Sequence, residues 1–211
     1  STKAKVQLPI LERLKGHLEE GNPVRNLELT EDDVEAIKEF NFITLKPVLY
    51  LCNVDEDGLT EDNDHVKKVK EVAAEDGSKV IKICGKLESE ISALETEDER
   101  AEFLEAAGLE KSGLQILTRE AYDLLGLKTY FTAGEKEVRA WTFKLGYKAP
   151  QAAGIIHTDF ERGFIKAEIY HCEDLFTLGT EQKVKEAGKL RIEGKEYVVK
   201  DGDIIHFRFN V

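Results

Sequence analysis

Two short apolar runs, separated by one helical segment, most constrain the fold of this chain. Residues 46–52 (Lys-Pro-Val-Leu-Tyr-Leu-Cys) and 79–84 (Lys-Val-Ile-Lys-Ile-Cys) each have the length and composition of a buried strand. The segment between them predicts a helix near 64–76, which Gly77 ends. Because strand, helix and strand follow one another, residues 46–84 predict a right-handed crossover unit of a parallel sheet.

The first strand runs directly into the loop Asn53-Val54-Asp55-Glu56. P-loop GTPases present their base-reading loop in this way, usually as N-K-x-D. The Asn amide can hydrogen-bond the base, and the Asp carboxylate can accept hydrogen bonds from N1 and N2 of guanine. Here Val54 and Glu56 stand at the second and fourth positions. Since the Glu side chain is one methylene longer than Asp, its carboxylate does not fit the position from which Asp forms two hydrogen bonds with guanine. Adenine therefore becomes a candidate base.

A second loop supports this interpretation, because an Asn and a Glu beside a strand end often form only a turn. Cys84-Gly85-Lys86 follows the second strand. In GTPases the loop at this position touches the base through its backbone N–H groups. The sequence therefore predicts a base-binding site made of Asn53, Val54, Glu56, Cys84, Gly85 and Lys86.

The loop that grips phosphate in such proteins, G-x-x-x-x-G-K-S/T, is absent from the 211 residues. The Gly-Lys pairs at Gly85, Gly188 and Gly194 are followed by Leu or Glu, never by Ser or Thr. Phosphate and Mg²⁺ then have no residues here to bind them. The sequence also lacks Met and begins within a predicted helix. We expect the C-terminal portion of a longer protein, without ATPase activity of its own.

Helical patterns lie on both sides of the crossover unit. Apolar residues at helical spacing over 6–18 predict one arm of a helical hairpin, which ends at Gly21. Thr30 is expected to cap a short second helix. Farther on, Thr96 opens a capping box with the Glu three residues later, and Ser112 begins another helix.

From Thr129 the pattern changes to short strands and turns. We expect one helix from Ala149 to about Arg162. Strands are predicted at 139–143, 165–170, 190–192, 197–199 and 204–209. Four or five strands crossed by one helix predict a ubiquitin-like grasp fold. The fold class is therefore α/β followed by α+β, and the predicted parts are 1–45, 46–128 and 129–211.

Charge is unevenly distributed along the chain, whose net charge is −12. Residues 128–211 hold 14 Lys and Arg against 13 Asp and Glu, whereas residues 1–127 hold the remaining 16 against 29. A well-solvated acidic surface explains the negative charge of residues 1–127. Because RNA is repelled by such a surface, any contact with RNA is expected in the second part. No apolar run is long enough to cross a membrane.

Arg139, Trp141 and Phe143 alternate along one predicted strand and therefore share a face. An Arg beside exposed aromatic rings would form a stacking surface for RNA, to which Lys144 and Lys148 would add charge. The alternative, which we favour, is that the two rings belong to the core and Arg139 covers an edge. The candidate surface for RNA or another partner is Arg139, Trp141, Lys144 and Lys148.

Other polar clusters have simpler interpretations. His157 with Asp159, and the run 171–174 (His-Cys-Glu-Asp), lack the ligand spacing of a zinc site, so no metal is predicted. The favoured interpretation of His157 is that it packs or caps near the helix end. No nucleophile elbow is present, so no catalytic residue is assigned. The three cysteines, Cys52, Cys84 and Cys172, have no C-x-x-C spacing. We favour reduced thiols that pack in the core of a cytoplasmic protein over redox sensors.

The chain resembles the YchF/Obg-like ATPases, a branch of the translation-factor-related (TRAFAC) P-loop GTPases, over essentially its whole length. One mark is Asn53-Val54-Asp55-Glu56 in place of N-K-x-D. The other is a series of C-terminal motifs. These are Tyr130-Phe131-Thr132-Ala133-Gly134, Glu137-Val138-Arg139-Ala140-Trp141-Thr142, Ala149-Pro150-Gln151-Ala152-Ala153, Ile156-His157-Thr158-Asp159-Phe160-Glu161, Gly163-Phe164-Ile165-Lys166-Ala167-Glu168 and Asp201-Gly202-Asp203-Ile204-Ile205-His206-Phe207.

The resemblance implies an intact protein with a nucleotide-binding domain, an inserted helical coiled coil and a C-terminal TGS domain of ubiquitin-like fold. Residues 1–20 would be the returning arm of the coiled coil. The family hydrolyses ATP in preference to GTP, with Mg²⁺, associates with ribosomes and is linked to the oxidative-stress response. By position, Asn53 would contact the base, Val54 would offer backbone groups to adenine, and Glu56 replaces the guanine-reading Asp.

Two functions remain open for these residues. They are either the base-recognition and TGS part of a YchF-type nucleotide hydrolase, or a non-catalytic module that binds RNA, the ribosome or a protein. In the first case ATP or GTP with Mg²⁺ belongs to the intact protein, and no cofactor is expected for the chain alone. We expect a cytoplasmic monomer that does not bind membranes.

Overall fold

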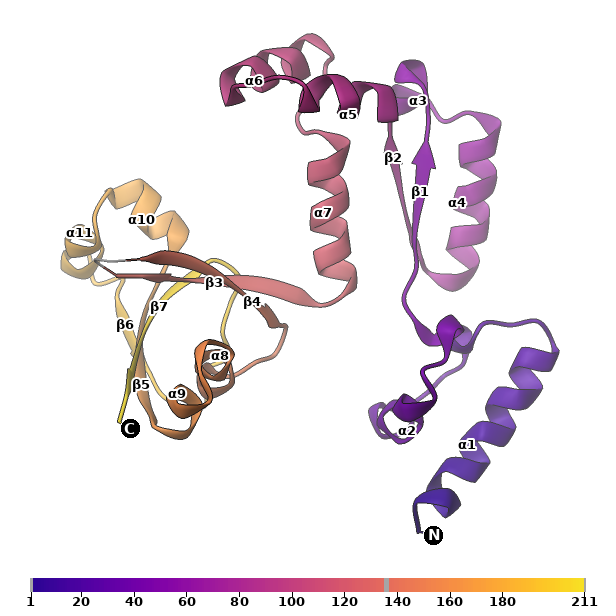
Figure 1. The fold of residues 1–211 in the computed structure, drawn as a ribbon, viewed down its shortest axis with the longest axis horizontal. Coiled ribbons are helices and arrows are strands. Elements are labelled where there is room, and N and C mark those ends of the chain that lie inside the picture. The colour runs from indigo at the N-terminus through magenta and orange to yellow at the C-terminus, as the bar shows by residue number, and fades with distance from the viewer. Residues whose placement is uncertain (1, 135–136, 211) are drawn as a thin grey trace. The chain divides into compact units, whose positions relative to one another are not determined.

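The computed structural model describes residues 2–134 and 137–210. The chain forms two compact units, Ser1–Leu124 and Leu125–Val211, which are described separately below (Figure 1). The predicted boundary at 128/129 falls inside strand β3 (Leu127–Ala133), which pairs with strands of the second unit. The three-part division at 45/46 and 128/129 stays a prediction.

The first unit begins with α1 (Thr2–Glu19), which packs on α2 (Glu31–Ile37). Short 3-10 helices, η1 (Val24–Asn26), η2 (Lys38–Phe40) and η3 (Ile43–Leu45), lead from here to the first strand. The predicted cap is confirmed, because the Thr30 hydroxyl accepts a hydrogen bond from the Asp33 N–H. The side chains that form the small core of this segment are Ile10, Leu14, Val24 and Ile37.

The parallel strand pair and intervening helix of the predicted crossover unit are confirmed, while its right-handedness stays a prediction. β1 (Leu49–Asn53) and β2 (Lys79–Ile83) pair in parallel, from Leu49 opposite Lys79 to Asn53 opposite Ile83. The connection holds α3 (Glu56–Thr60) and α4 (Asp64–Asp76), and Gly77 ends α4 in the left-handed conformation with φ 69°. Figure 1 shows the strand pair between α4 and α7 (Gly113–Leu124), both of which contact it.

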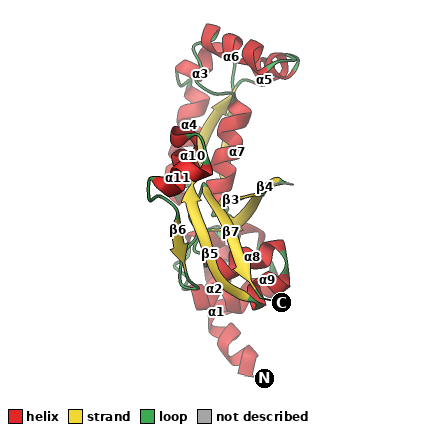
Figure 2. Ribbon diagram, turned by 90° about the vertical axis from the view of Figure 1, so that its left-hand side faces the viewer, coloured by secondary structure: helices red, strands yellow, loops and turns green. Residues whose placement is uncertain are grey.

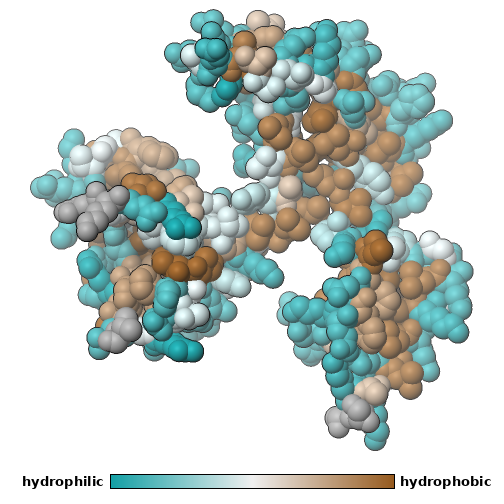
Figure 3. All heavy atoms as spheres, viewed as in Figure 1, coloured by the Kyte–Doolittle hydropathy of each residue, from teal (hydrophilic) through white to brown (hydrophobic). Residues whose placement is uncertain are grey.

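The prediction that the first strand is buried is wrong for the described residues. The Leu51 side chain of β1 is 40% exposed. Among the described residues β1 pairs only with β2, so its second edge has no strand. Figure 3 shows hydrophobic side chains gathered on this part of the unit. The exposed large hydrophobic residues of β1 and α7 include Leu51 and Ile116. A parallel sheet is normally covered on both faces, so this surface is incompletely covered.

Three helices follow β2 in the first unit: α5 (Gly85–Ser92), α6 (Glu97–Ala106) and α7. The capping box at the start of α6 is confirmed, since Thr96 and Glu99 exchange hydrogen bonds between side chain and backbone. The predicted start of α7 at Ser112 is also confirmed, because its hydroxyl accepts a hydrogen bond from the Gln115 N–H at 3.1 Å.

The second unit is a five-stranded sheet in the order β4-β3-β7-β5-β6 (Figure 2). The remaining strands are β4 (Val138–Lys144), β5 (Phe164–His171), β6 (Arg191–Glu193) and β7 (Asp203–Phe209). β3 and β7 are parallel and the other pairs are antiparallel. The helices α8 (Ala149–Ile156) and α9 (Thr158–Arg162) pack against the sheet. Tyr130 is fully buried in this core and donates its hydroxyl hydrogen to the Ala152 carbonyl at 2.9 Å.

Three predictions for the second unit need correction. The helix expected over 149–162 breaks at His157, whose extended backbone ends α8 and whose Nδ1 accepts the Asp159 N–H at the start of α9. Residues 197–199 are not a strand, because only Val198 forms an isolated bridge, to Lys148. Two short helices, α10 (Cys172–Leu178) and α11 (Glu181–Glu186), were not predicted. They pack their apolar side chains against Tyr170 and Ile204.

Candidate functional site

The predicted base-binding residues come together at one end of the β1–β2 pair. Because the strands are parallel, the loops that follow them lie at the same edge of the sheet. They line a hollow of about 470 Å³ formed by Asn53, Val54, Asp55, Glu56, Asp57, Cys84, Gly85 and Lys86. All six predicted residues are in this set, so the structure brings them together, while their role in binding a base stays a prediction.

Asn53 joins the two loops. Its Oδ1 accepts a hydrogen bond from the Gly85 N–H at 3.0 Å. A Cβ added at Gly85 would lie 3.3 Å from the same oxygen, so the close approach of the two loops favours glycine. Val54 donates its own N–H to the Ile83 carbonyl at 2.8 Å. Because the Val54 N–H is used in this hydrogen bond, only the Val54 carbonyl is available to hydrogen-bond a ligand.

Glu56 and Lys86 form an ion pair across the hollow. Lys86 Nζ lies 2.8 Å from Glu56 Oε1 and 4.0 Å from Glu90 Oε1. The hydrogen bond to Glu56 raises the pKa of Lys86, and the nearby carboxylate charges add to this effect. Both side chains are more than half exposed, so water and ligands reach them. The site therefore presents one acceptor and one cationic donor side by side.

The sequence did not predict this ion pair, nor the role of Asp55. The Asp55 carboxylate accepts the Gly58 N–H at 2.9 Å and caps α3. It therefore shapes the loop, although Asp55 and Glu56 both line the hollow. A signal for the cap was present, since Asp is a preferred N-cap residue, whose carboxylate accepts a backbone N–H of the first helical turn. The contact between Glu56 and Lys86 spans 30 residues and has no local signal.

The preferred interpretation of strand β4 is confirmed. Phe143 is buried at 2% exposure, and Trp141 packs against the same core while its Nε1 donates to Thr132 Oγ1 at 2.9 Å. The Arg139 guanidinium lies over the Trp141 ring, 4.0 Å from its centre, in a cation–π contact. Arg139 therefore covers one face of the Trp141 ring.

The structure does not gather the whole predicted partner surface. Lys144 follows Phe143 in β4 and so lies on the sheet face opposite Arg139 and Trp141. Lys148 is at the start of α8 and pairs with Glu196. The RNA-binding role of these four residues stays a prediction.

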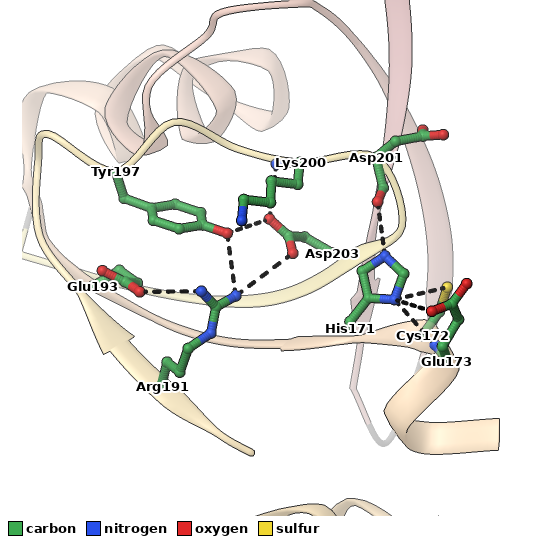
Figure 4. A network of polar contacts seen from close by, with 9 residues as sticks. All are labelled: His171, Cys172, Glu173, Arg191, Glu193, Tyr197, Lys200, Asp201 and Asp203. Atoms are coloured by element: carbon green, nitrogen blue, oxygen red, sulfur yellow. Dashed lines mark hydrogen bonds and ion pairs between the residues drawn. The ribbon is translucent and has the colours of Figure 1, made fainter. Parts of the chain in front are cut away.

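A polar network lies in the second unit (Figure 4). Asp203 is only 1% exposed, and its Oδ2 accepts hydrogen bonds from the Tyr197 hydroxyl at 2.8 Å and the Lys200 N–H at 2.9 Å. Arg191 donates to the Tyr197 oxygen at 3.2 Å and lies 3.9 Å from Asp203. Burial raises the pKa of Tyr197 to about 12. The network fixes the loop before β7.

The run 171–174 is a helix start. His171 Nδ1 accepts the Glu173 N–H at 3.3 Å, and Nε2 contacts the Asp201 carbonyl at 2.9 Å. Gly202 allows this contact, since an added Cβ would lie 2.7 Å from His171 Nε2. Within residues 2–134 and 137–210 no group of His, Cys, Asp or Glu could hold a metal ion.

Comparisons with known proteins agree with this arrangement. Residues 127–210 match the family model YchF-GTPase_C, described as "Protein of unknown function (DUF933)". The chain is 53% identical over 207 residues to the ribosome-binding ATPase YchF of Bacillus subtilis, a match that covers 97% of this chain and 56% of that protein. It is 42% identical over 209 residues to Obg-like ATPase 1 of Caenorhabditis elegans, covering 98% of this chain and 52% of that protein.

Solved structures show the same relationship. The YchF GTPase of Schizosaccharomyces pombe superposes with a TM-score of 0.83 at 39% identity, over 95% of this chain and 53% of that one. A GTP-binding protein from Pyrococcus horikoshii superposes with a TM-score of 0.55 at 17% identity, over 93% of this chain and 56% of that one, which is a likeness of fold alone.

The chain is thus a mixed α/β protein with the fold of part of a YchF-type GTPase. It spans just over half the length of the curated relatives it matches. Together the family model, the curated relatives and the solved structure support the YchF/Obg-like ATPase family for this chain. None of the described helices is both long and apolar enough to span a bilayer.

Proposed function

We propose that these residues are the base-recognition part and the C-terminal domain of a longer YchF-type nucleotide hydrolase, which binds ATP and GTP and hydrolyses them with Mg²⁺. The observation that carries this proposal is the meeting of Asn53 and Glu56 with Gly85 and Lys86 at the ends of two parallel strands. Relatives about twice as long, named as ATPases, support it. The phosphates and Mg²⁺ would be bound by residues outside this sequence, which lacks the G-x-x-x-x-G-K-S/T loop.

The Glu56–Lys86 pair suits more than one base. The carboxylate would accept from the N6 amino group of adenine while the ammonium donates to N1. The same two groups would accept from N1–H and donate to O6 of guanine. The Val54 carbonyl adds an acceptor, which, opposite position 6 of the purine, would accept from the N6 amino group of adenine but would meet the O6 acceptor of guanine. A preference for ATP that still allows GTP follows from this set of donors and acceptors.

We infer that the second unit is a TGS domain with a β-grasp fold. Its hairpin β3–β4, the following α8 and the parallel placement of the first strand beside the last support this inference. The partial P-loop sheet would be β1 and β2, extended by strands from the rest of the protein. Because relatives carry the name ribosome-binding, we propose the ribosome as the partner, and the cytoplasm as the compartment.

A substitution of the base loop tests the proposal in the complete polypeptide that contains this sequence. Val54→Lys with Glu56→Asp restores the N-K-x-D pattern and is expected to move the ratio of ATP to GTP affinity toward GTP by about tenfold or more. Equilibrium titration with labelled nucleotides measures the ratio. Val72→Lys with Glu71→Asp, on the exposed face of α4, is the matched control. An unchanged ratio in the loop variant would remove the assigned role of Glu56.

A second candidate function is binding without chemistry. The nearly neutral second part of the sequence favours it, since the acidic first part would be repelled by RNA. Co-sedimentation of the 211-residue chain with purified ribosomes, at low and moderate salt, tests it. Binding that weakens with salt would place a ribosome contact in these residues. The absence of binding at both salt concentrations would assign the contact to the rest of the protein.

A further inference from the structure

Helix α6 of the first unit is incompletely covered. None of its residues is buried, although it carries Phe103 and Leu104, which are only half-buried, and the exposed Ala101. A surface helix normally buries an apolar stripe against its own domain. The apolar side of α6 therefore has room for contacts beyond those that the first unit makes.

An open groove of about 560 Å³ lies along this helix, between α5, α6 and the start of α7. Its size is within the range of sites that take small ligands or a few side chains of a partner. The Leu114 side chain, 62% exposed, borders it. The other apolar side chains that line it are Ile91, Ala101, Leu104 and Leu109.

Hydrogen bonds hold in place two charged side chains that line the groove, Glu88 and Arg100. The Glu88 carboxylate accepts the N–H groups of Gly113 and Leu114, at 2.6 and 3.1 Å, at the N-terminus of α7. The Arg100 guanidinium donates to Glu97 at 2.7 Å and to the Leu94 carbonyl at 2.8 Å. A ligand would therefore meet a preformed surface.

The rim of the groove is acidic. Glu105 and Glu110 line it, are exposed and form no ion pair among the described residues. Residues 95–110 hold seven Asp and Glu and a single Arg. This concentration of charge attracts cations and repels nucleic acid. Figure 3 shows a largely hydrophilic face over α5 and α6, with few apolar side chains among the polar ones.

We propose that this groove docks a cationic amphipathic segment of a protein partner. Apolar side chains of the segment enter the groove over Leu104, Leu109 and Leu114, as in helix-in-groove recognition. Lys and Arg on its flanks pair with Glu105 and Glu110. The proposal does not depend on the base-binding site, because the lining residues of the two sites do not overlap.

The probe for the test is a fluorescein-labelled 18-residue peptide with Leu on one helical face and Lys on the other. Fluorescence anisotropy measures its affinity for the 211-residue chain. A peptide of the same composition, permuted so that no apolar face forms, is the peptide control. The proposal expects the amphipathic peptide to bind at least about tenfold more tightly. Equal affinities would overturn it, since charge alone would then explain binding.

Two pairs of variants locate the binding. Glu105→Lys with Glu110→Lys is expected to weaken binding at least about tenfold, whereas Glu71→Lys with Glu75→Lys on α4 changes the net charge equally and is expected to have an effect of less than about twofold. Leu114→Asp is expected to weaken binding, and Val72→Asp, also at an exposed site, is its control. Equal losses in the groove variants and their controls would overturn the proposal.

The last measurement is the affinity of the complete polypeptide for the amphipathic peptide. The proposal expects it to bind the amphipathic peptide as the 211-residue chain does. Loss of binding in the longer protein would overturn the proposal, because the groove would then be filled by the protein's own residues.

Discussion

At the scale of single residues, Asn53 has two separable roles. Its Oδ1 holds the Gly85 N–H, and its amide nitrogen is the group that remains for a base. Asn53→Asp keeps the acceptor and removes the donor, whereas Asn53→Ala removes both.

We predict that Asn53→Ala lowers the free energy of unfolding by about 1 kcal/mol, the value of a typical hydrogen bond, and that Asn53→Asp lowers it less. Both variants are expected to weaken nucleotide binding by the complete polypeptide. Urea denaturation of the 211-residue chain and nucleotide titration of the longer protein measure the two effects. Normal nucleotide affinity in Asn53→Asp would show that the Asn amide does not contact the base.

Tyr197 illustrates how a single hydroxyl fixes a loop. Removal of its hydroxyl takes one of two hydrogen bonds from the Oδ2 of the buried Asp203, which keeps only the Lys200 N–H. We predict that Tyr197→Phe lowers the free energy of unfolding by about 1–2 kcal/mol. Tyr147→Phe is the control, because that partly buried ring also packs on the core but its hydroxyl makes no hydrogen bond with a described residue. Equal effects in chemical denaturation would contradict the account of this network.

At the scale of elements, local signals were sufficient where a cap or a turn set the boundary. Gly77 ends α4, and Thr30 and Thr96 begin their helices, as the sequence predicted. The capping role favoured for His157 is confirmed, but the break there was missed, because the helix was expected to run on to about Arg162. The helices α10 and α11 were missed because they are short and depend on packing against Tyr170 and Ile204.

In the candidate site, too, some features had a local sequence signal and others depended on the folded structure. Parallel pairing of β1 and β2 was predictable from the strand–helix–strand pattern, and it brings both loops to one edge. The Glu56–Lys86 pair depends on where two exposed side chains point after folding, which periodicity does not encode. The burial of β1 was predicted wrongly, because its apolar composition reflects cover that the described residues do not provide.

At the scale of the whole molecule, we assign recognition of the base to these residues and the chemistry to the rest of the protein. We predict that the purified 211-residue chain does not hydrolyse ATP above the rate of a blank, because no residues for the phosphates and Mg²⁺ are present. A phosphate-release assay measures this, with the complete polypeptide as the positive control. Robust hydrolysis by a contaminant-free preparation of the chain would contradict the prediction.

The most direct test of the central claim is photo-crosslinking of 2-azido-ATP to the complete polypeptide, followed by identification of the labelled peptides by mass spectrometry. The azide is on the base, so labelling reports what the base contacts. The account predicts crosslinks in residues 53–57 or 84–86 that unlabelled ATP suppresses. ATP-protected crosslinks that lie only outside these two loops would contradict it.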